Sequence, residues 1–196
     1  MPGAGVCAIV LAAGQGSRYR AAGGADKLLA SSLRDAPAPP VLAATLADLR
    51  GVAERLLVVT NADNCPLRDW LAAHAEGCEV LAVETRGLGH SLAQAVAQAP
   101  VARGWLVALG DMPYVQPATL RAIAAAIEHD NLVVPVHQGR AGHPRGIGSA
   151  YRDALLQLDG DRGAQQLFAQ PAVQRLEVDD PGVLLDIDHP DDRRLA

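Results

Sequence analysis

Short apolar runs separated by helical segments constrain the fold of this chain more than any other feature of its sequence. Five such runs lie at residues 6–12, 55–60, 78–83, 105–111 and 131–136. The segments at 39–50, 65–75, 89–99 and 117–129 instead space their apolar residues as an amphipathic helix does. Continuous apolar strands that alternate with helices are typical of a mostly parallel sheet covered on both faces. The sequence therefore predicts a doubly wound α/β fold, with ligands at the carboxyl ends of the strands.

Beyond residue 136 the alternation weakens. The stretch HQGRAGHPRGIG (137–148) predicts a hairpin or a similar excursion, and residues 30–40 predict a loop. We expect short helices at 151–158 and 163–170, and late strands at 173–178 and 183–188. No internal repeat is present in the sequence, and we expect one domain that spans residues 1–196.

Composition limits the classes of partner. Hydrophobic residues make up 49% of the chain, which is enough for a sizeable core. A net charge of -5 argues against nucleic acid as a partner, although a local cationic loop can still bind a small anion. The three cysteines lack metal-ligand spacing, which fits a reducing compartment. We see no leader pattern and no apolar run long enough to cross a membrane, so we expect a cytoplasmic protein without a membrane partner.

A glycine-rich loop, Gly14–Lys27, directly follows the first apolar run. It does not match the Walker pattern, because Leu28 follows the lysine, and Tyr19 stands where the dinucleotide pattern needs its third glycine. Glycines let backbone N–H groups approach phosphate oxygens, and Arg18 and Lys27 can neutralise a polyphosphate. A glycine-rich turn with solvated charges is the alternative interpretation.

A second glycine-rich stretch, GLGHSLAQAV, begins a predicted helix at residues 87–96. Gly89 and Ser91 near the start of this helix could form a cradle for an anion or a base. A capped helix with a glycine entry explains the same pattern, so this stretch is weak evidence by itself.

Carboxylates follow two of the late apolar runs. Asp111 comes at the carboxyl end of a buried strand, and Asp186 and Asp188 end the last predicted strand on one shared face. Carboxylate oxygens together with substrate phosphates are the ligands that Mg²⁺ prefers. An Asx-turn is the alternative for Asp111.

Arg140, His143 and Arg145 form a cationic cluster in the sequence GRAGHPR. We expect this cluster near the place where a second substrate, the acceptor, would bind. A solvated turn explains the cluster nearly as well. A cationic loop and two metal-binding strand ends are the groups that phosphoryl or nucleotidyl transfer needs, with no protein nucleophile.

Six segments occur in the order LAAGQGSRY…DKLL, GLGHSL, LGDMPYV, GHP, GDRGA and LLDIDHPDD. In this order they resemble the MobA-like nucleotidyltransferases, and among these most the molybdenum cofactor cytidylyltransferases. The resemblance runs from about residue 5 to the C-terminus. The subfamily rests on LAAG, where the guanylyltransferase branch usually has LAGG, and on the GHP, GDRGA and DID-x-P segments.

The resemblance implies a Rossmann-like fold and an enzyme that transfers CMP from CTP to the terminal phosphate of molybdopterin, with Mg²⁺ as cofactor and pyrophosphate as product. Residues of about 5–136 would form the nucleotide-binding half. Residues of about 137–196 would form the acceptor side and the C-terminal part of the metal site. A molybdoenzyme or its chaperone is an expected protein partner.

The resemblance also implies roles for individual residues. Arg18, Lys27 and Asp111 would be catalytic, and Arg140 and His143 would bind the acceptor. Asp111 would bind the metal, with Asp186 favoured over Asp188 as second ligand. The nucleotide would contact Leu11, Ala12, Ala13, Gly14, Gly16, Ser17, Arg18, Lys27, Gly89, Ser91 and Asp111.

Three departures from the family pattern remove positive charge. The lysine of a Gly-Lys-Pro segment after DKLL is missing, Ala141 replaces an arginine in GRRGHP, and Gln165 replaces an arginine after GD-x-GA. These three departures leave the identity of the acceptor undetermined. The alternatives are a guanylyltransferase of the same pathway, an NTP transferase for a sugar or alditol phosphate, and a non-catalytic nucleotide-binding accessory protein for molybdoenzyme maturation. The sequence determines neither the base nor the oligomeric state.

Overall fold

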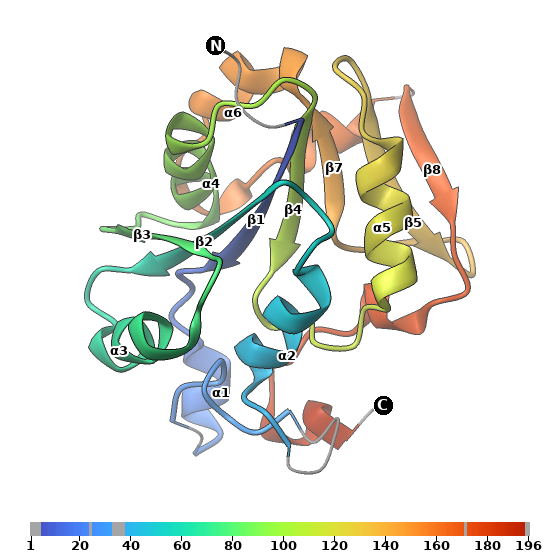
Figure 1. The fold of residues 1–196 in the computed structure, drawn as a ribbon. Helices are drawn as coiled ribbons and strands as arrows, with labels where there is room; N and C mark the ends of the chain where they lie inside the picture. Colours follow the sequence, from blue (N-terminus) through green and yellow to red (C-terminus); the bar gives the residue numbers. More distant parts are fainter. Residues whose placement is uncertain (1–4, 24, 33–37, 171, 195–196) are drawn as a thin grey trace.

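The computed structural model describes residues 5–23, 25–32, 38–170 and 172–194 as one mixed sheet with helices on both faces (Figure 1). The strands are β1 (Val6–Ala12), β2 (Arg55–Asn61), β3 (Glu79–Val83), β4 (Gly104–Leu109), β5 (Leu132–His137), β6 (Arg140–Ala141), β7 (Arg145–Gly148) and β8 (Val173–Glu177). The α-helices are α1 (Ser17–Ala21), α2 (Val41–Leu49), α3 (Cys65–His74), α4 (Leu88–Gln98), α5 (Pro117–Ala126) and α6 (Arg152–Leu156). Short 3-10 turns complete the chain: η1 (Ser149–Tyr151), η2 (Gly160–Arg162), η3 (Gln165–Ala169), η4 (Pro181–Leu184) and η5 (Pro190–Arg194).

The strand order is β3-β2-β1-β4-β7-β5-β6, and β8 also pairs with β5. Strands β3, β2, β1 and β4 are mutually parallel, and β8 is parallel to β5. Strand β7 runs antiparallel between β4 and β5 and returns the chain from the β5–β6 hairpin. The predicted doubly wound, mostly parallel α/β fold and the hairpin at 137–148 are therefore confirmed.

Alternate residues of the central strands face two separate cores. Val10 of β1 packs with α2, α3 and α5, whereas Ile9 beside it packs with α4 and α6 on the other face. Trp105 is fully buried in the second core and donates a hydrogen bond from Nε1 to the Ala99 carbonyl oxygen at 2.8 Å. Burial on both faces explains why these strands appear in the sequence as continuous apolar runs.

Three local expectations need correction. The chain at 183–188 is not a strand: η4 (Pro181–Leu184) covers its first two residues, and the Ile187 N–H bonds to the Asp111 carbonyl oxygen at 3.0 Å instead of a strand neighbour. The predicted helix at 163–170 is the 3-10 turn η3, whereas the short helix predicted at 151–158 is confirmed by α6. The short helix α1 lies inside the glycine-rich segment that we expected to be a loop. Part of the loop expected at 30–40, residues 33–37, lies outside the described residues.

Asp180 anchors the C-terminal segment to the β4–α5 connection. Its buried carboxylate accepts hydrogen bonds from the N–H groups of Gln116 and Gly182, both at 2.9 Å. At Gly182 an added Cβ would lie only 2.1 Å from the Tyr114 carbonyl oxygen, so a glycine is needed for this close approach. The chain that continues to Asp186 and Asp188 therefore starts from a fixed point beneath β4. In the described part of the chain no helix has the length and apolar character that crossing a membrane requires.

We predict that Asp180→Ala lowers the free energy of unfolding by about 1–3 kcal/mol, because the buried Gly182 N–H and the part-buried Gln116 N–H lose their acceptor. The neighbouring exposed Asp179 provides the matched control, and Asp179→Ala should change stability by less than about 0.5 kcal/mol. Urea unfolding of the three proteins measures both effects. Equal stabilities for the two variants would show that the Asp180 contacts contribute nothing.

Candidate active site

The glycine-rich loop begins where β1 ends and passes directly into α1. Gly16 precedes this helix with φ +58, a left-handed conformation that favours glycine. The aliphatic part of Lys27 lies over Gly16, because a Cβ built there would be 3.6 Å from the Lys27 Cγ. The loop thus folds back so that the ammonium of Lys27 reaches the carboxyl edge of the sheet.

Asp26 fixes the backbone beside this lysine. Its carboxylate accepts hydrogen bonds from the Leu28 N–H at 2.9 Å and from the Asn64 Nδ2 at 2.7 Å. Asn64 in turn caps α3 by accepting from the Leu67 N–H at 3.2 Å, as its place before that helix predicts. Sequence reasoning did not assign a role to Asp26, and its position directly before the candidate lysine Lys27 was the available signal.

A cavity of about 690 Å³ opens between the glycine-rich loop and the start of α4. Most of the residues predicted to contact the nucleotide line it: Leu11, Ala12, Ala13, Gly14, Gly16, Ser17, Lys27, Ser91 and Asp111. The lining also includes Gln15, Leu28, Thr85, Arg86, Gly87, Leu88, Leu109 and Asp161. Two of the predicted residues are placed differently, since Arg18 and Gly89 lie outside this lining.

The wall at α4 depends on glycines and on an internal hydroxyl network. Gly87 has φ +129, and an added Cβ would lie 2.4 Å from the carbonyl carbon of Gly160 in η2. At Gly89 a Cβ would lie 3.1 Å from the Asp159 and Gly160 oxygens, so this glycine serves helix packing. The buried Ser91 hydroxyl lies 2.7 Å from the Thr85 Oγ1 and donates to the Gly87 carbonyl oxygen. Ser91 therefore shapes the start of α4 from within.

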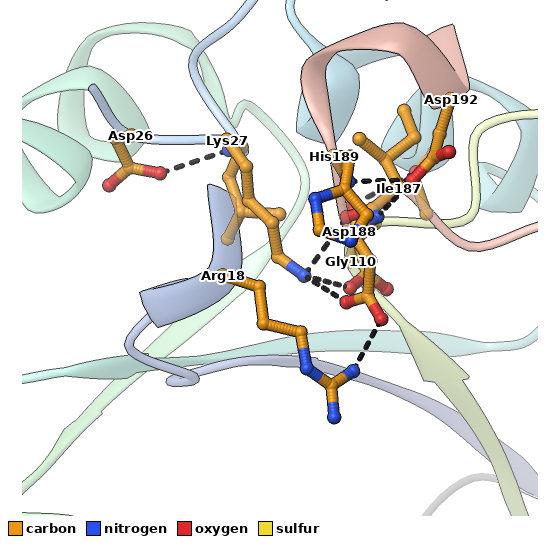
Figure 2. A network of polar contacts seen from close by, with 11 residues as sticks. Arg18, Asp26, Lys27, Gly110, Ile187, Asp188, His189 and Asp192 are labelled. Carbon is orange, nitrogen blue, oxygen red and sulfur yellow. Dashed lines mark hydrogen bonds and ion pairs between the residues drawn. The ribbon is translucent and has the colours of Figure 1, made fainter. Parts of the chain in front are cut away.

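Lys27 connects three remote segments of the chain at the carboxyl edge of β4 (Figure 2). Its Nζ lies 2.5 Å from the Asp111 Oδ2, 3.8 Å from the Asp188 Oδ1, and donates to the Ile187 carbonyl oxygen at 3.1 Å. The side chains of Lys27 and Asp111 are only 14% and 17% exposed. Arg18, 71% exposed, reaches the other oxygen of Asp188 at 2.6 Å. The predicted catalytic residues Arg18, Lys27 and Asp111 are therefore brought together.

The carboxylates predicted to bind metal lie at the same place. Partial desolvation, followed by the charges of Asp111 and Asp188, raises the pKa of the Asp186 carboxyl, while Lys27 opposes the shift. Asp111, Asp186 and Asp188 supply hard carboxylate oxygens, the kind of donor that Mg²⁺ and Mn²⁺ prefer. Lys27 stands between Asp111 and Asp188, and within the described residues no group of three or more His, Cys, Asp or Glu is arranged to hold a metal ion. The carboxylate oxygens have the chemistry that a divalent cation needs, and Lys27 contacts two of these carboxylates in this structure.

The predicted acceptor residues occupy two different positions. Arg140 is exposed and pairs with His137 near the tip of the β5–β6 hairpin. His143 lies before β7, largely buried, with its Nδ1 unpaired among the described residues. Burial, and then the nearby Arg145 charge, lower the pKa of His143 to about 4. His143 is therefore neutral at physiological pH.

We predict a pH-dependent contribution of His143 to stability. Between pH 6.5 and about 4, His143 is protonated in the unfolded chain but neutral in the folded protein. Its contribution to the free energy of unfolding is therefore fully present above pH 6.5 and is lost as the pH falls to about 4. The loss should amount to roughly 3 kcal/mol. Chemical unfolding of the protein and of His143→Gln at pH 7 and pH 4 measures it as the change in their stability difference. A difference independent of pH would contradict the prediction, and His189→Gln, at an exposed histidine, serves as control.

Comparisons with known proteins show the family and the fold to which this chain belongs. The model of the MobA-like NTP transferase domain matches residues 8–176. Rv0371c from Mycobacterium tuberculosis is 31% identical with a TM-score of 0.81, covering 97% of both chains, and another structure of it is a complex with manganese. A nucleotidyl transferase from Methanothermobacter, Mth528, is 26% identical with a TM-score of 0.79 over 98% of this chain and 96% of the other.

A bifunctional protein GlmU from Geobacter sulfurreducens is 32% identical over 150 residues, which is 75% of this chain. The chain spans only about 30% of the length of that relative, and 24% of the length of a second GlmU, from Paracidovorax citrulli. These relatives therefore correspond to this chain over one part of a longer protein.

Proposed function

Because this chain belongs to the MobA-like NTP transferase family and is a nucleotidyltransferase, we propose that it transfers CMP from CTP to the terminal phosphate of molybdopterin. The observation that carries the proposal is the single cavity that joins the LAAG loop to Lys27 and Asp111. The LAAG sequence favours cytidine, and the GHP and GDRGA segments favour a molybdopterin acceptor.

The glycine-rich loop and helix α4 contact different parts of the nucleotide. Leu11, Ala12, Ala13 and Gly14 contact the nucleoside, and the exposed Leu88 offers an apolar surface for the base. Lys27 and Arg18 bind the triphosphate, which replaces the carboxylates that they contact without ligand. Mg²⁺, held by Asp111 and by Asp186 or Asp188, would neutralise charge on the triphosphate. The manganese complex of Rv0371c supports the use of a divalent metal.

The transfer is a direct displacement. An oxygen of the acceptor phosphate attacks the α-phosphorus of CTP, the bond to the bridging oxygen of the β-phosphate breaks, and pyrophosphate leaves with the bonding electrons. An ionised acceptor phosphate has no proton to lose, so no protein base is needed. Lys27 neutralises the charge that develops on the leaving pyrophosphate.

The decisive measurement is pyrophosphate release from each of the four NTPs with and without molybdopterin. We expect release with CTP only when molybdopterin is present. Release with GTP instead would identify a guanylyltransferase, and release with a sugar or alditol phosphate in place of molybdopterin would identify another acceptor. No release with any pair would favour the non-catalytic accessory protein.

We predict that Lys27→Ala lowers the turnover of this reaction on the order of 10²-fold or more, because the developing phosphate charge loses its cation. Arg50→Ala removes an exposed positive charge at the end of α2 and should leave turnover unchanged. Steady-state pyrophosphate release measures both. Wild-type turnover in the Lys27 variant would exclude this residue from the reaction.

Lys27 is the only lysine among the 17 basic residues, which permits a test of nucleotide binding without turnover. We predict that CTP slows the labelling of Lys27 by an amine-directed reagent, because the triphosphate occupies its ammonium. Peptide mapping by mass spectrometry measures the rate at Lys27, and the rate at the N-terminal amine is the internal control. Labelling of Lys27 at the same rate with saturating CTP would contradict the proposed triphosphate contact.

A further inference from the structure

Arg145 is the first residue of β7. This strand lies beside β4, and Asp111 follows the carboxyl end of β4. Arg145 pairs with Val107 in the antiparallel register of β4 and β7. Leu109 follows Val107 by two residues, so both side chains lie on the same face of the sheet, and Leu109 lines the nucleotide cavity. Arg145 therefore lies one step along the sheet from that cavity, on the same face.

In the part of the chain that the structure describes, the guanidinium of Arg145 has no anionic partner. Its Nε is buried without a hydrogen bond, and no ion pair to Arg145 occurs among the described residues. The ring of Phe168 in η3 lies 4.6 Å from its Cζ and holds the guanidinium plane by a cation–π contact. Burial lowers the pKa of Arg145, as the cost of a desolvated and unpaired cation requires. A partly buried cation without a partner carries a desolvation cost, which an anionic ligand would offset.

The order of the strands assigns that ligand to the acceptor. Along the carboxyl edge the glycine-rich loop follows β1, Asp111 follows β4, and Arg145 begins β7. The triphosphate side and Arg145 thus flank Asp111 from opposite sides. In-line displacement needs the attacking oxygen opposite the leaving pyrophosphate. The segment from η2 to η3 borders both the nucleotide cavity and Arg145. Asp161 lines the cavity, and the ring of Phe168 lies against the Arg145 guanidinium.

We infer that Arg145, held on Phe168, is an anion subsite that binds the phosphate group of a phosphorylated acceptor. This inference rests on the proposed function and names the chemistry of its second substrate. Arg145 supplies a positive charge at the start of β7, whereas Ala141 and Gln165 stand instead of the family's arginines. It replaces the exposed Arg140 as the cation expected to meet the acceptor, since Arg140 lies nearer the hairpin tip.

The first experiment compares the two Michaelis constants in pyrophosphate release from CTP and molybdopterin. Arg145→Gln should raise the KM for the acceptor by about tenfold to hundredfold, the range of a charge-assisted hydrogen bond, and change the KM for CTP by less than about twofold. Arg145→Lys should recover part of the loss. Arg152→Gln removes the next cation along the chain, beyond the other end of β7, and should change neither KM. An unchanged acceptor KM in Arg145→Gln would overturn the inference.

The second experiment needs no turnover. In protein labelled with ¹⁵N-arginine, the Nε–H signal that disappears in Arg145→Gln identifies this residue. Titration with inorganic phosphate should shift that signal, and sodium chloride at equal ionic strength should not. No specific shift would overturn the inference. A phosphate-specific shift in a protein that releases pyrophosphate with no NTP and acceptor would support the subsite and refute the proposed function. Thermal unfolding of Arg145→Gln controls for its fold.

Discussion

The contact between Lys27 and Asp111 organises the candidate active site. It joins residues 84 positions apart, and the same ammonium holds the carbonyl of Ile187, 160 positions away. Three segments that carry the predicted chemistry therefore meet at one nitrogen atom. Because both side chains are largely shielded from water, the attraction between them is stronger than that of an exposed pair. Asp26 and Asn64 support this contact from the loop side, and Asp180 supports it from the C-terminal side.

Sequence reasoning succeeded where local pattern determines structure. The buried strands are continuous apolar runs, so β1, β2 and β4 could be located from these runs alone. Asp111 could be placed at the site because the carboxyl edge of a parallel sheet collects the residues that follow its strands. The cap of α3 by Asn64 is likewise local.

The rest depended on contacts between distant residues. The apolar letters of 183–188 predict a strand, but Asp180 and Gly182 turn the chain into η4, and the backbone of Ile187 bonds to the residue at the end of β4. Asp180 is one of three aspartates within 179–186, and only its burial distinguishes it. Arg145 appeared in the sequence as one member of a cationic turn. Its packing on Phe168 and its lack of an anionic partner among the described residues are tertiary features that the spacing of residues does not reveal.

The cations of the two substrate sides differ in what they contact without ligand. Lys27 and Arg18 already have carboxylate partners, so under the proposed function a triphosphate would have to displace Asp111 and Asp188 before it gained their charge. Arg145 is partly desolvated and has no acid partner among the described residues, so an acceptor phosphate would meet it without such an exchange. The proposed nucleotide side would therefore discriminate against weak anions, since their attraction must exceed that of a partly buried carboxylate. The proposed acceptor side would lack this competition and would depend on the fixed orientation of one guanidinium.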